Sequence, residues 1–214
     1  MVGTVTRWWW IRHAPVVEHG GKIYGQGDIA CDISDTRSFE GLAKKLPIGA
    51  KWVTSHLSRT KDTAKAILQA GELDLITSSE IFEEPNFAEQ SFGDWQDCTW
   101  DDLHAQASPE YKSFWNNPGY HAPPGGESFF DLMERTNSAI WRLNDEFPNR
   151  DIIAVTHGGT IRAAVALAIG AKPMMALGVT INNLTLTRLD YVSEGLYRGQ
   201  GGVWRIEGIN LPPI

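Results

Sequence analysis

Two stretches of sequence decide the fold: Trp8-Trp9-Trp10-Ile11 leads directly into Arg12-His13, and Ile152-Ile153-Ala154-Val155-Thr156 leads into His157-Gly158-Gly159. Each is a short, nearly continuous apolar run of the kind that forms a central strand covered on both faces. In an open α/β sheet the ligand crevice lies beyond the carboxyl ends of the strands. We therefore expect the two histidines to meet in one site, although they lie far apart in the sequence.

Helical patterns alternate with these strands. From Glu127 to Phe147 apolar residues recur at spacings of three and four, which predicts one buried helical face, and Pro148 ends that helix. A second helix is predicted from Gly158 to about Ile169, with Gly170 as its C-cap. The other predicted elements are helices around 39–46 and at 58–70, and strands at 51–54, 183–190 and 203–206.

This alternation predicts an α/β fold, a three-layer α/β/α sandwich with a mostly parallel central sheet that the last two strands close in an antiparallel arrangement. Within the first strand, Trp8 and Trp10 point to one face and Trp9 to the other. The tryptophan triplet is therefore predicted to anchor a central strand between two helical layers. We expect a single domain over 1–214, with a lid or insertion at about 81–124, where the sequence is acidic, aromatic and less periodic.

The bulk properties are those of an ordinary globular protein. The 214 residues are 42% hydrophobic and 21% charged, and no apolar run approaches the ~20 residues that a membrane span needs. The net charge of −7 argues against nucleic acid as a partner, because binding to a phosphate backbone needs a basic face. The N-terminal apolar run lacks a basic leader, and two cysteines without a CxxC motif fit a reducing compartment, so a cytoplasmic location is expected. The sequence does not give the oligomeric state.

Five residues together suit phosphoryl transfer: Arg12, His13, Arg59, Glu89 and His157. A transferring phosphoryl group carries negative charge on its equatorial oxygens, so catalysis needs positive donors fixed around it. A neutral imidazole is a competent nucleophile and can hold the phosphoryl group covalently. A carboxylic acid can protonate the leaving oxygen and then accept a proton from water.

Taken singly, each of these residues has an ordinary structural interpretation. A lone histidine at a strand end is more often a hydrogen-bonded structural residue, and Arg59 could be a solvated residue at a helix start. The glycines after His157 could simply form a tight turn from strand to helix. The order and context of the residues decide between these interpretations.

Five blocks follow one another along the chain: Arg12-His13, the segment from Ser55 to Ala64, the segment from Ala88 to Trp95, Gly125-Gly126-Glu127-Ser128, and Thr156 to Gly159. In this order they resemble the Arg-His-Gly, Ser-Pro-Leu-x-Arg-Ala, Glu-x-x-Phe-Gly-x-Trp, Gly-Gly-Glu-Ser and second-histidine motifs of the histidine phosphatase superfamily, the phosphoglycerate-mutase-like proteins. The resemblance covers roughly residues 5 to 170.

The resemblance implies His13 as the nucleophile, Glu89 as the general acid and base, and Arg12, Arg59 and His157 as the phosphate pocket. It implies no metal and no cofactor. Backbone amides around Gly25 and at the helix start near Gly158 are expected to add anion contacts. The implied function is hydrolysis of a small phosphorylated metabolite through a phosphohistidine intermediate, with inorganic phosphate as a product.

The chain departs from the family pattern directly after His13. Where the family has glycine, a polar residue and threonine, this chain has Ala14, Pro15 and Val16, and the usual downstream asparagine is replaced by His19. We expect the chemistry to survive with altered substrate contacts. His56 stands in place of a common proline, which is predicted to be a change at the surface or rim.

Within the family the choice lies between a phosphatase and a phosphoglycerate mutase. A mutase must hold an acidic intermediate, and the predicted lid is instead crowded with carboxylates such as Glu83 and Asp101. This favours a phosphatase, and the Gly-Gly-Glu-Ser block with the compact length is similar to the alpha-ribazole-phosphate phosphatase type. A catalytically silent phospho-ligand-binding protein is the alternative from another class, but such a protein has no evident use for Glu89.

Three unrelated chemistries fit the sequence poorly. A serine hydrolase would need a Gly-x-Ser-x-Gly elbow, which the sequence lacks. A metal site at His13, Glu18 and His19 fits no zincin spacing. The glycines of Gly25-x-Gly27-x-x-Ala30 match a dinucleotide fingerprint only superficially, because this segment neither follows a predicted strand nor opens a predicted helix.

Overall fold

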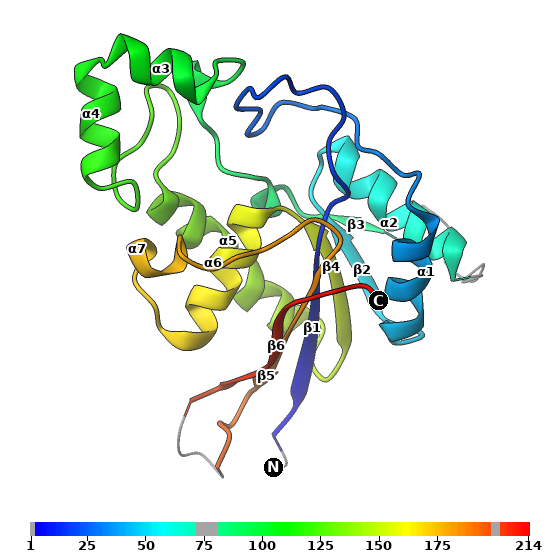
Figure 1. Cartoon of the computed structure of the whole chain (residues 1–214). Helices are drawn as coiled ribbons and strands as arrows, with labels where there is room; N and C mark the ends of the chain where they lie inside the picture. Colours follow the sequence, from blue (N-terminus) through cyan, green and yellow to red (C-terminus); the bar gives the residue numbers. More distant parts are fainter. Residues whose placement is uncertain (1–2, 72–80, 198–201) are drawn as a thin grey trace.

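The computed structural model describes residues 3–71, 81–197 and 202–214, and it shows a central sheet between two layers of helices (Figure 1). The strands are β1 (Val5–Arg12), β2 (Lys51–Thr54), β3 (Phe82–Glu83), β4 (Asp151–Thr156), β5 (Leu186–Val192) and β6 (Trp204–Leu211). Their order in the sheet is β3-β2-β4-β1-β5-β6. The first four of these are parallel, whereas β5 runs antiparallel to both β1 and β6. The predicted α/β/α sandwich with a mostly parallel sheet is confirmed.

Two helices cover each face of the sheet. Helices α1 (Thr36–Lys45) and α2 (Ser58–Ala70) pack on one face, and α5 (Phe129–Glu146) and α6 (Gly158–Ile169) on the other (Figure 1). Trp8 and Trp10 are buried beneath α5 and α6 with their rings stacked at 4.8 Å, whereas Trp9 packs against the core under α1 and α2. The predicted alternation of the triplet is confirmed, and it holds β1 between the two helical layers.

The pairing of β1 with β4 brings the two histidines to the same edge of the sheet. Arg12 is the register partner of Thr156, so His13 and His157 directly follow two neighbouring parallel strands. The amide of His13 continues the ladder by donating to the carbonyl of Thr156 at 2.9 Å. The geometry of parallel pairing alone therefore places both side chains beyond the carboxyl ends of the strands.

Helix α6 ends at the predicted C-cap, and helix α5 begins at a capping box that was not predicted. Ser128 and Asp131 form a reciprocal capping box at the start of α5, and Gly170 ends α6 with φ +65°. The last two strands lie later than predicted, because Leu184 has a φ of +57° and the chain before it turns rather than extends. A register shift between β5 and β6 then lets β6 continue to Leu211.

The segment from Glu84 to Pro124 leaves the sheet and carries short helices that the sequence pattern did not predict. These are the 3-10 turns η2 (Pro85–Phe87) and η3 (Gly93–Trp95) and the helices α3 (Trp100–Gln106) and α4 (Pro109–Asn116). They have a small core of their own, formed by Trp95, Leu103 and Phe114 with Ile23 from the loop after β1. Strand β3 (Phe82–Glu83) pairs with β2 and belongs to the sheet. The segment outside the sheet therefore begins only after Glu83. Its function as a lid stays a prediction.

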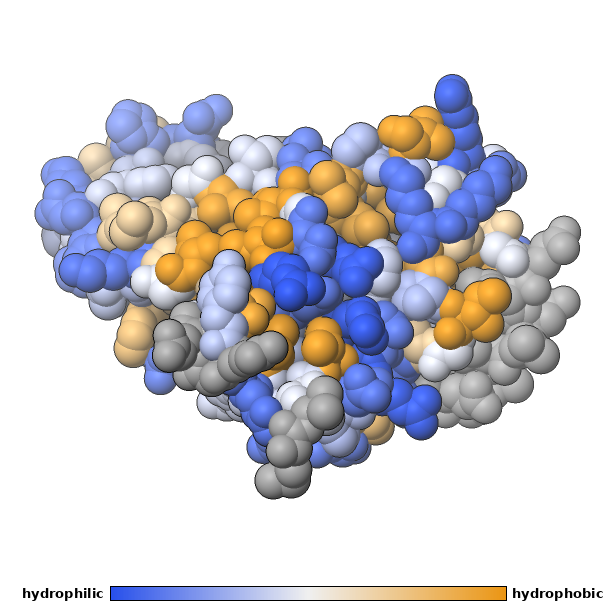
Figure 2. All heavy atoms as spheres, turned by 90° about the horizontal axis from the view of Figure 1, so that it is seen from below, coloured by the Kyte–Doolittle hydropathy of each residue, from blue (hydrophilic) through white to orange (hydrophobic). Residues whose placement is uncertain are grey.

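The two ends of the sheet differ in what they carry. Figure 1 shows α3 and α4 on the side where β1 ends, and the short helix α7 (Pro173–Ala176) follows α6. Figure 2 views the molecule from below, where β1 begins, and shows an apolar patch bordered by hydrophilic residues. None of the described helices is long and apolar enough to cross a membrane.

Candidate active site

His13 is a buried, neutral imidazole at the end of β1. Its Nδ1 lies 2.7 Å from the carbonyl oxygen of Ala14, and because a carbonyl only accepts, Nδ1 carries the proton and Nε2 carries the lone pair. Burial lowers the pKa of His13 to about 3, and the charges of Arg59 and Arg12 act in the same direction. The ring is therefore uncharged at neutral pH with one nitrogen available as a nucleophile.

His157 lies beside His13, as the two strand ends predict. The ring centroids are 5.2 Å apart, and His157 Nε2 is 2.8 Å from the hydroxyl oxygen of Ser55 at the end of β2. Burial, with the neighbouring His13 and arginines, holds the pKa of His157 well below its usual value. Its Nδ1 is buried and has no hydrogen-bond partner among the described residues.

Arg59 enters the site from the first turn of α2. Its two terminal nitrogens donate to the carbonyl oxygens of Gly27 and Gly25, each at 2.7 Å, and its guanidinium lies over the ring of Tyr24 at 5.2 Å. Gly25, predicted as an amide donor to an anion, here acts through its carbonyl. Its φ of +44° and the proximity of the Gln90 carbonyl require glycine. An anion contact from the Gly25 amide stays a prediction.

Arg12 lies over the first residue of α6. Its terminal nitrogen donates to the carbonyl of Ile181 at 2.6 Å, and its Nε lies 3.5 Å from the position that a Cβ on Gly158 would take. The Nε atoms of Arg12 and Arg59 are both buried without a hydrogen-bond partner among the described residues, like Nδ1 of His157. Buried polar groups are rarely left unpaired. Among the described residues eight buried polar side-chain atoms lack a partner, and three of them belong to these residues close to His13, where they are available to an anion.

Glu89 reaches the same place from the segment after η2. Its Oε1 accepts the amide of Gly159 at 3.1 Å and the amide of Gln90 at 2.9 Å. A Cβ on Gly159 would overlap this carboxylate, so the close approach depends on glycine. The amide predicted to bind an anion is that of Gly158, whereas the contact between the Gly159 amide and Glu89 was not predicted.

An ion pair between Arg135 on α5 and Glu127, just before the helix, holds the backbone around Glu89. Arg135 donates to the carbonyl oxygens of Asn86 at 2.7 Å and of Ala88 and Glu89 at 2.9 Å, and it pairs with Glu127. Glu127 in turn accepts the amide of Ser91 at 2.9 Å. Gly125 to Ser128 was predicted only as a motif and helix start, and no local pattern marks Arg135.

Two further residues that sequence reasoning missed fix the backbone around His13. The amide nitrogen of Asn183 donates to the His13 carbonyl at 2.7 Å, and Thr63 accepts the amide of Ala14 at 2.9 Å. No local pattern marks Asn183, because it lies 170 residues from its partner. Both contacts help to fix the orientation of the imidazole.

The residues that depart from the family pattern belong to the scaffold of the neighbouring loop. Ala14 is fully buried, the carbonyl of Pro15 accepts the amide of Asp32 at 2.7 Å, and Val16 forms a β-bridge with Cys31. His56 is exposed, in line with the predicted surface position. The effect of residues 14 to 16 on substrate stays a prediction.

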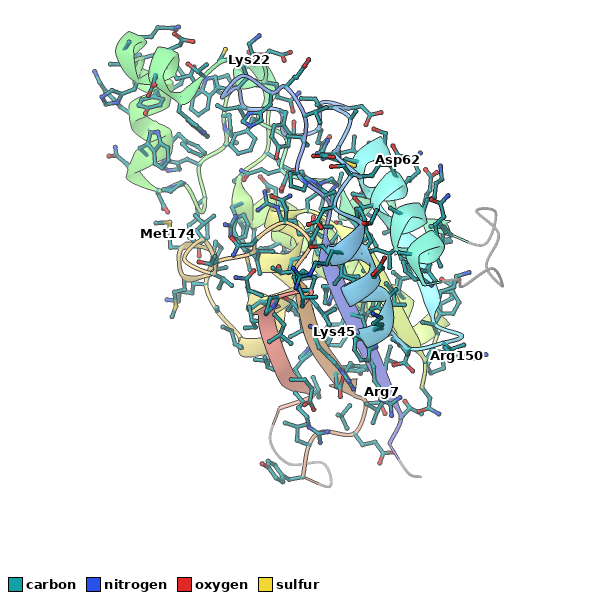
Figure 3. All side chains as sticks on the ribbon, turned by 45° about the vertical axis from the view of Figure 1, so that its right-hand side comes forward. Arg7, Lys22, Lys45, Asp62, Arg150 and Met174 are labelled. Atoms are coloured by element: carbon teal, nitrogen blue, oxygen red, sulfur yellow. The ribbon has the colours of Figure 1, made fainter. Side chains whose placement is uncertain are left out.

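A cavity of about 340 Å³ opens beside Glu89 and Gly159. Its walls are largely apolar and aromatic, with contributions from Tyr24, Phe92, Trp100, Phe129 and Leu177. Charged or titratable side chains also line it, namely His19, Lys22, Glu89 and Arg162. Figure 3 shows Lys22 at the end of the molecule that carries α3 and α4, far from Arg7 and Arg150. The cavity is placed to hold the group that Glu89 would protonate.

Comparison with known proteins gives the same family as the motifs. The chain is 29% identical over 160 residues to the metal-independent phosphoserine phosphatase of Arabidopsis thaliana, which covers 69% of this chain and 65% of that protein. It is 29% identical over 178 residues to the glucosyl-3-phosphoglycerate phosphatase of Mycolicibacterium vanbaalenii, over 75% of each chain. The chain thus spans just under two thirds of the plant protein.

The fold has a solved counterpart. The crystal structure of a putative alpha-ribazole-5'-P phosphatase from Escherichia coli superposes with a TM-score of 0.79 and 21% identity, covering 96% of both chains. The family model of the histidine phosphatase superfamily (branch 1) matches residues 8–198, which contain both histidines, both arginines and Glu89. The chain belongs to the histidine phosphatase superfamily.

Proposed function

We propose that this protein is a metal-independent phosphatase that hydrolyses small phosphomonoesters through a phosphohistidine at His13. The observation that carries the proposal is a set of three buried nitrogens, on Arg12, Arg59 and His157, that have no hydrogen-bond partner in the described part of the chain and lie near a neutral imidazole. A phosphoryl group between them would satisfy these donors and bring its phosphorus to His13. Phosphatases among the relatives support the reaction class.

In the first step Nε2 of His13 attacks phosphorus and the ester P–O bond breaks. Glu89, as the carboxylic acid, gives its proton to the leaving oxygen, and an N–P bond forms. Positive charge then develops on the imidazole, whose Nδ1–H already donates to the carbonyl of Ala14. That carbonyl dipole stabilises the phosphohistidine and keeps Nε2 as the attacking atom.

In the second step water attacks the phosphohistidine. The Glu89 carboxylate takes a proton from this water, the N–P bond breaks, and inorganic phosphate leaves with His13 neutral again. Arg12, Arg59 and His157 stabilise the oxygens in both steps. When the Ser55 hydroxyl donates to Nε2 of His157, the ring proton is on Nδ1. This N–H would then donate a hydrogen bond to a phosphate oxygen.

The apolar walls of the cavity suit a leaving group with an apolar body, and an alpha-ribazole-like phosphate is one such ester. Phosphoglycerate mutase chemistry is less well supported, because the segment around Glu83 to Asp102 is acidic. We also propose a cytoplasmic location, supported by the free thiols Cys31 and Cys98. The expected partners are the substrate and inorganic phosphate, without nucleic acid or membrane.

The decisive test is hydrolysis of an aryl phosphate in the presence of a chelator, with acid- and alkali-quenched samples assayed for bound phosphate. We expect turnover through an acid-labile, alkali-stable adduct that His13→Ala abolishes, while the control His104→Ala, at an exposed position on α3, keeps it. Wild-type rates in His13→Ala would contradict the nucleophile. No phosphate release from a panel of alpha-ribazole phosphate, phosphoserine and phosphoglycerates would favour the silent binding protein.

A further inference from the structure

Arg162 is a half-buried cation that lines the cavity and forms no salt bridge among the described residues. It lies on α6, three residues after the Gly159 amide that holds Glu89, and its Nε donates to the carbonyl of Val179 at 2.7 Å. Among the described residues no carboxylate oxygen lies within 4.0 Å of its guanidinium. Its side chain is thus anchored at Nε, and the residue is part of the cavity wall.

The other arginines show how unusual this is. Outside the site, each half-buried arginine of the described chain has a carboxylate within 4.0 Å: Arg7 has Asp151, Arg135 has Glu127 and Arg188 has Asp190. The buried or half-buried arginines without one are Arg12, Arg59 and Arg162. The first two flank His13 and are explained by the phosphoryl group. Arg162 needs a separate explanation.

The charges of the site leave Arg162 unmatched when a substrate is bound. With Glu89 protonated as the acid, the two negative charges of a phosphomonoester balance Arg12 and Arg59. Burial disfavours the charge of Arg162 and lowers its pKa, although Glu89 opposes this effect. A guanidinium nevertheless stays ionised in proteins. A half-buried positive charge therefore remains next to the leaving group.

We propose that Arg162 binds a carboxylate on the leaving group, so that the preferred substrates are phosphomonoesters of hydroxy acids with an apolar body. This inference rests on the proposed phosphatase function. The planar guanidinium can form two parallel hydrogen bonds to a carboxylate. A carboxylate also carries one negative charge, which balances the one positive charge of Arg162. Tyr24, Phe92 and Phe129 would contact the apolar body. Lys22 also lines the cavity but is exposed, so its charge is better screened by water.

The test compares two substrates that differ only in this charge, 4-carboxyphenyl phosphate and its neutral isostere 4-carbamoylphenyl phosphate. For the wild type we expect kcat/KM to be on the order of tenfold higher for the carboxylate, as for a charge-assisted hydrogen bond. Arg162→Met should bring the ratio near one, and Arg162→Lys should keep part of it. Losses that both substrates share cancel in the ratio. Arg150→Met, an exposed position at the far end of the sheet, is the control (Figure 3).

A wild-type ratio near one would overturn the inference and leave the phosphatase function standing, with a neutral leaving group instead. An unchanged ratio in Arg162→Met would also overturn it, because the preference for the carboxylate would then come from another positively charged side chain. Failure of the wild type to hydrolyse either ester would contradict the phosphatase function itself. Circular dichroism of each variant establishes that it is folded, and Arg162→Gln serves as a second neutral replacement.

Discussion

At the scale of single residues, the site combines two uncharged histidines with fixed positive donors. The burial that lowers the pKa of His13 and His157 removes positive charge from both rings. In the proposed mechanism the neutral His13 then has a lone pair for attack, and Arg12 and Arg59 supply the charge that the phosphoryl oxygens need. The division of labour follows from the environment of each residue rather than from its type.

Glu89 is the residue for which leaving-group chemistry gives the clearest prediction. Glu89→Gln keeps an acceptor oxygen for the Gly159 amide but removes the transferable proton. We expect alkyl phosphates, whose leaving oxygen needs that proton, to lose on the order of 10²–10⁴-fold in kcat, and 4-nitrophenyl phosphate to lose far less. Steady-state rates across a series of esters measure the difference. An equal loss for all esters would remove Glu89 from the acid role.

Gly159 gives a steric prediction at the same carboxylate. In Gly159→Ala the added Cβ would overlap Glu89 Oε1 and approach Leu132 to 3.1 Å, so Glu89 must move. We expect a fall of about 10²-fold in kcat, since a displacement of about 1 Å has this cost, measured with a poor leaving group. Gly158→Ala is the matched variant, because its Cβ would meet Arg12 only at 3.5 Å. A smaller loss in Gly159→Ala than in Gly158→Ala would contradict this geometry.

At the scale of elements, helix α5 and the residues just before it hold the segment that carries Glu89, the proposed general acid. Arg135 on α5 and Glu127, two residues before the helix begins, bind the segment from Asn86 to Ser91 through three of its carbonyl oxygens and the Ser91 amide. Gln90 adds a bond from its side chain to the Glu127 carbonyl at 2.9 Å. The segment is thus fixed to a rigid helix rather than left as a free loop.

Arg135→Met tests this dependence. It removes three bonds to backbone carbonyls and leaves Glu127 without its partner, so we expect a loss of about 1–3 kcal/mol in the free energy of unfolding and a larger fall in kcat for poor than for good leaving groups. Chemical denaturation and the ester series measure the two effects. In the double variant Arg135→Met/Glu127→Gln, the free energy of unfolding should rise back towards the wild-type value. The larger fall in kcat for poor leaving groups should remain. A uniform fall in all rates would indicate a merely structural role.

At the scale of the whole molecule, the buried histidines couple the site to global stability. In the folded protein the pKa of His13 lies near 3 and that of His157 well below normal, whereas unfolded histidines titrate near pH 6.5. Below about pH 6.5 the unfolded chain takes up protons that the folded protein does not. The stabilising contribution is therefore complete above about pH 6.5 and is lost as the pH falls towards 3.

Urea denaturation at several pH values between about 7 and 5 measures this slope, with up to ~1.4 kcal/mol per pH unit expected from each histidine. His157→Asn should remove one histidine's share of the slope. Carboxylates with lowered pKa, such as Asp28, act only at lower pH because unfolded aspartate titrates near 3.9. A slope that is the same in His157→Asn and in the wild type would contradict the assignment.

The sequence by itself determined the layers, the bounds of the main elements of the sandwich before β5, and the meeting of the two histidines. Strands 51–54 and 151–156 and helix 58–70 follow from local periodicity and capping, and parallel pairing then places both strand ends at one edge. Only the tertiary structure decided the environment of the site. It shows the bond of Glu89 to Gly159, the bonds of Arg135 to the backbone around Glu89, the contact of Asn183 with His13, and the position of Arg162 without a salt bridge among the described residues. The reason is physical, since periodicity reports which face of an element is buried, whereas contacts across 70 or 170 residues depend on how the elements pack.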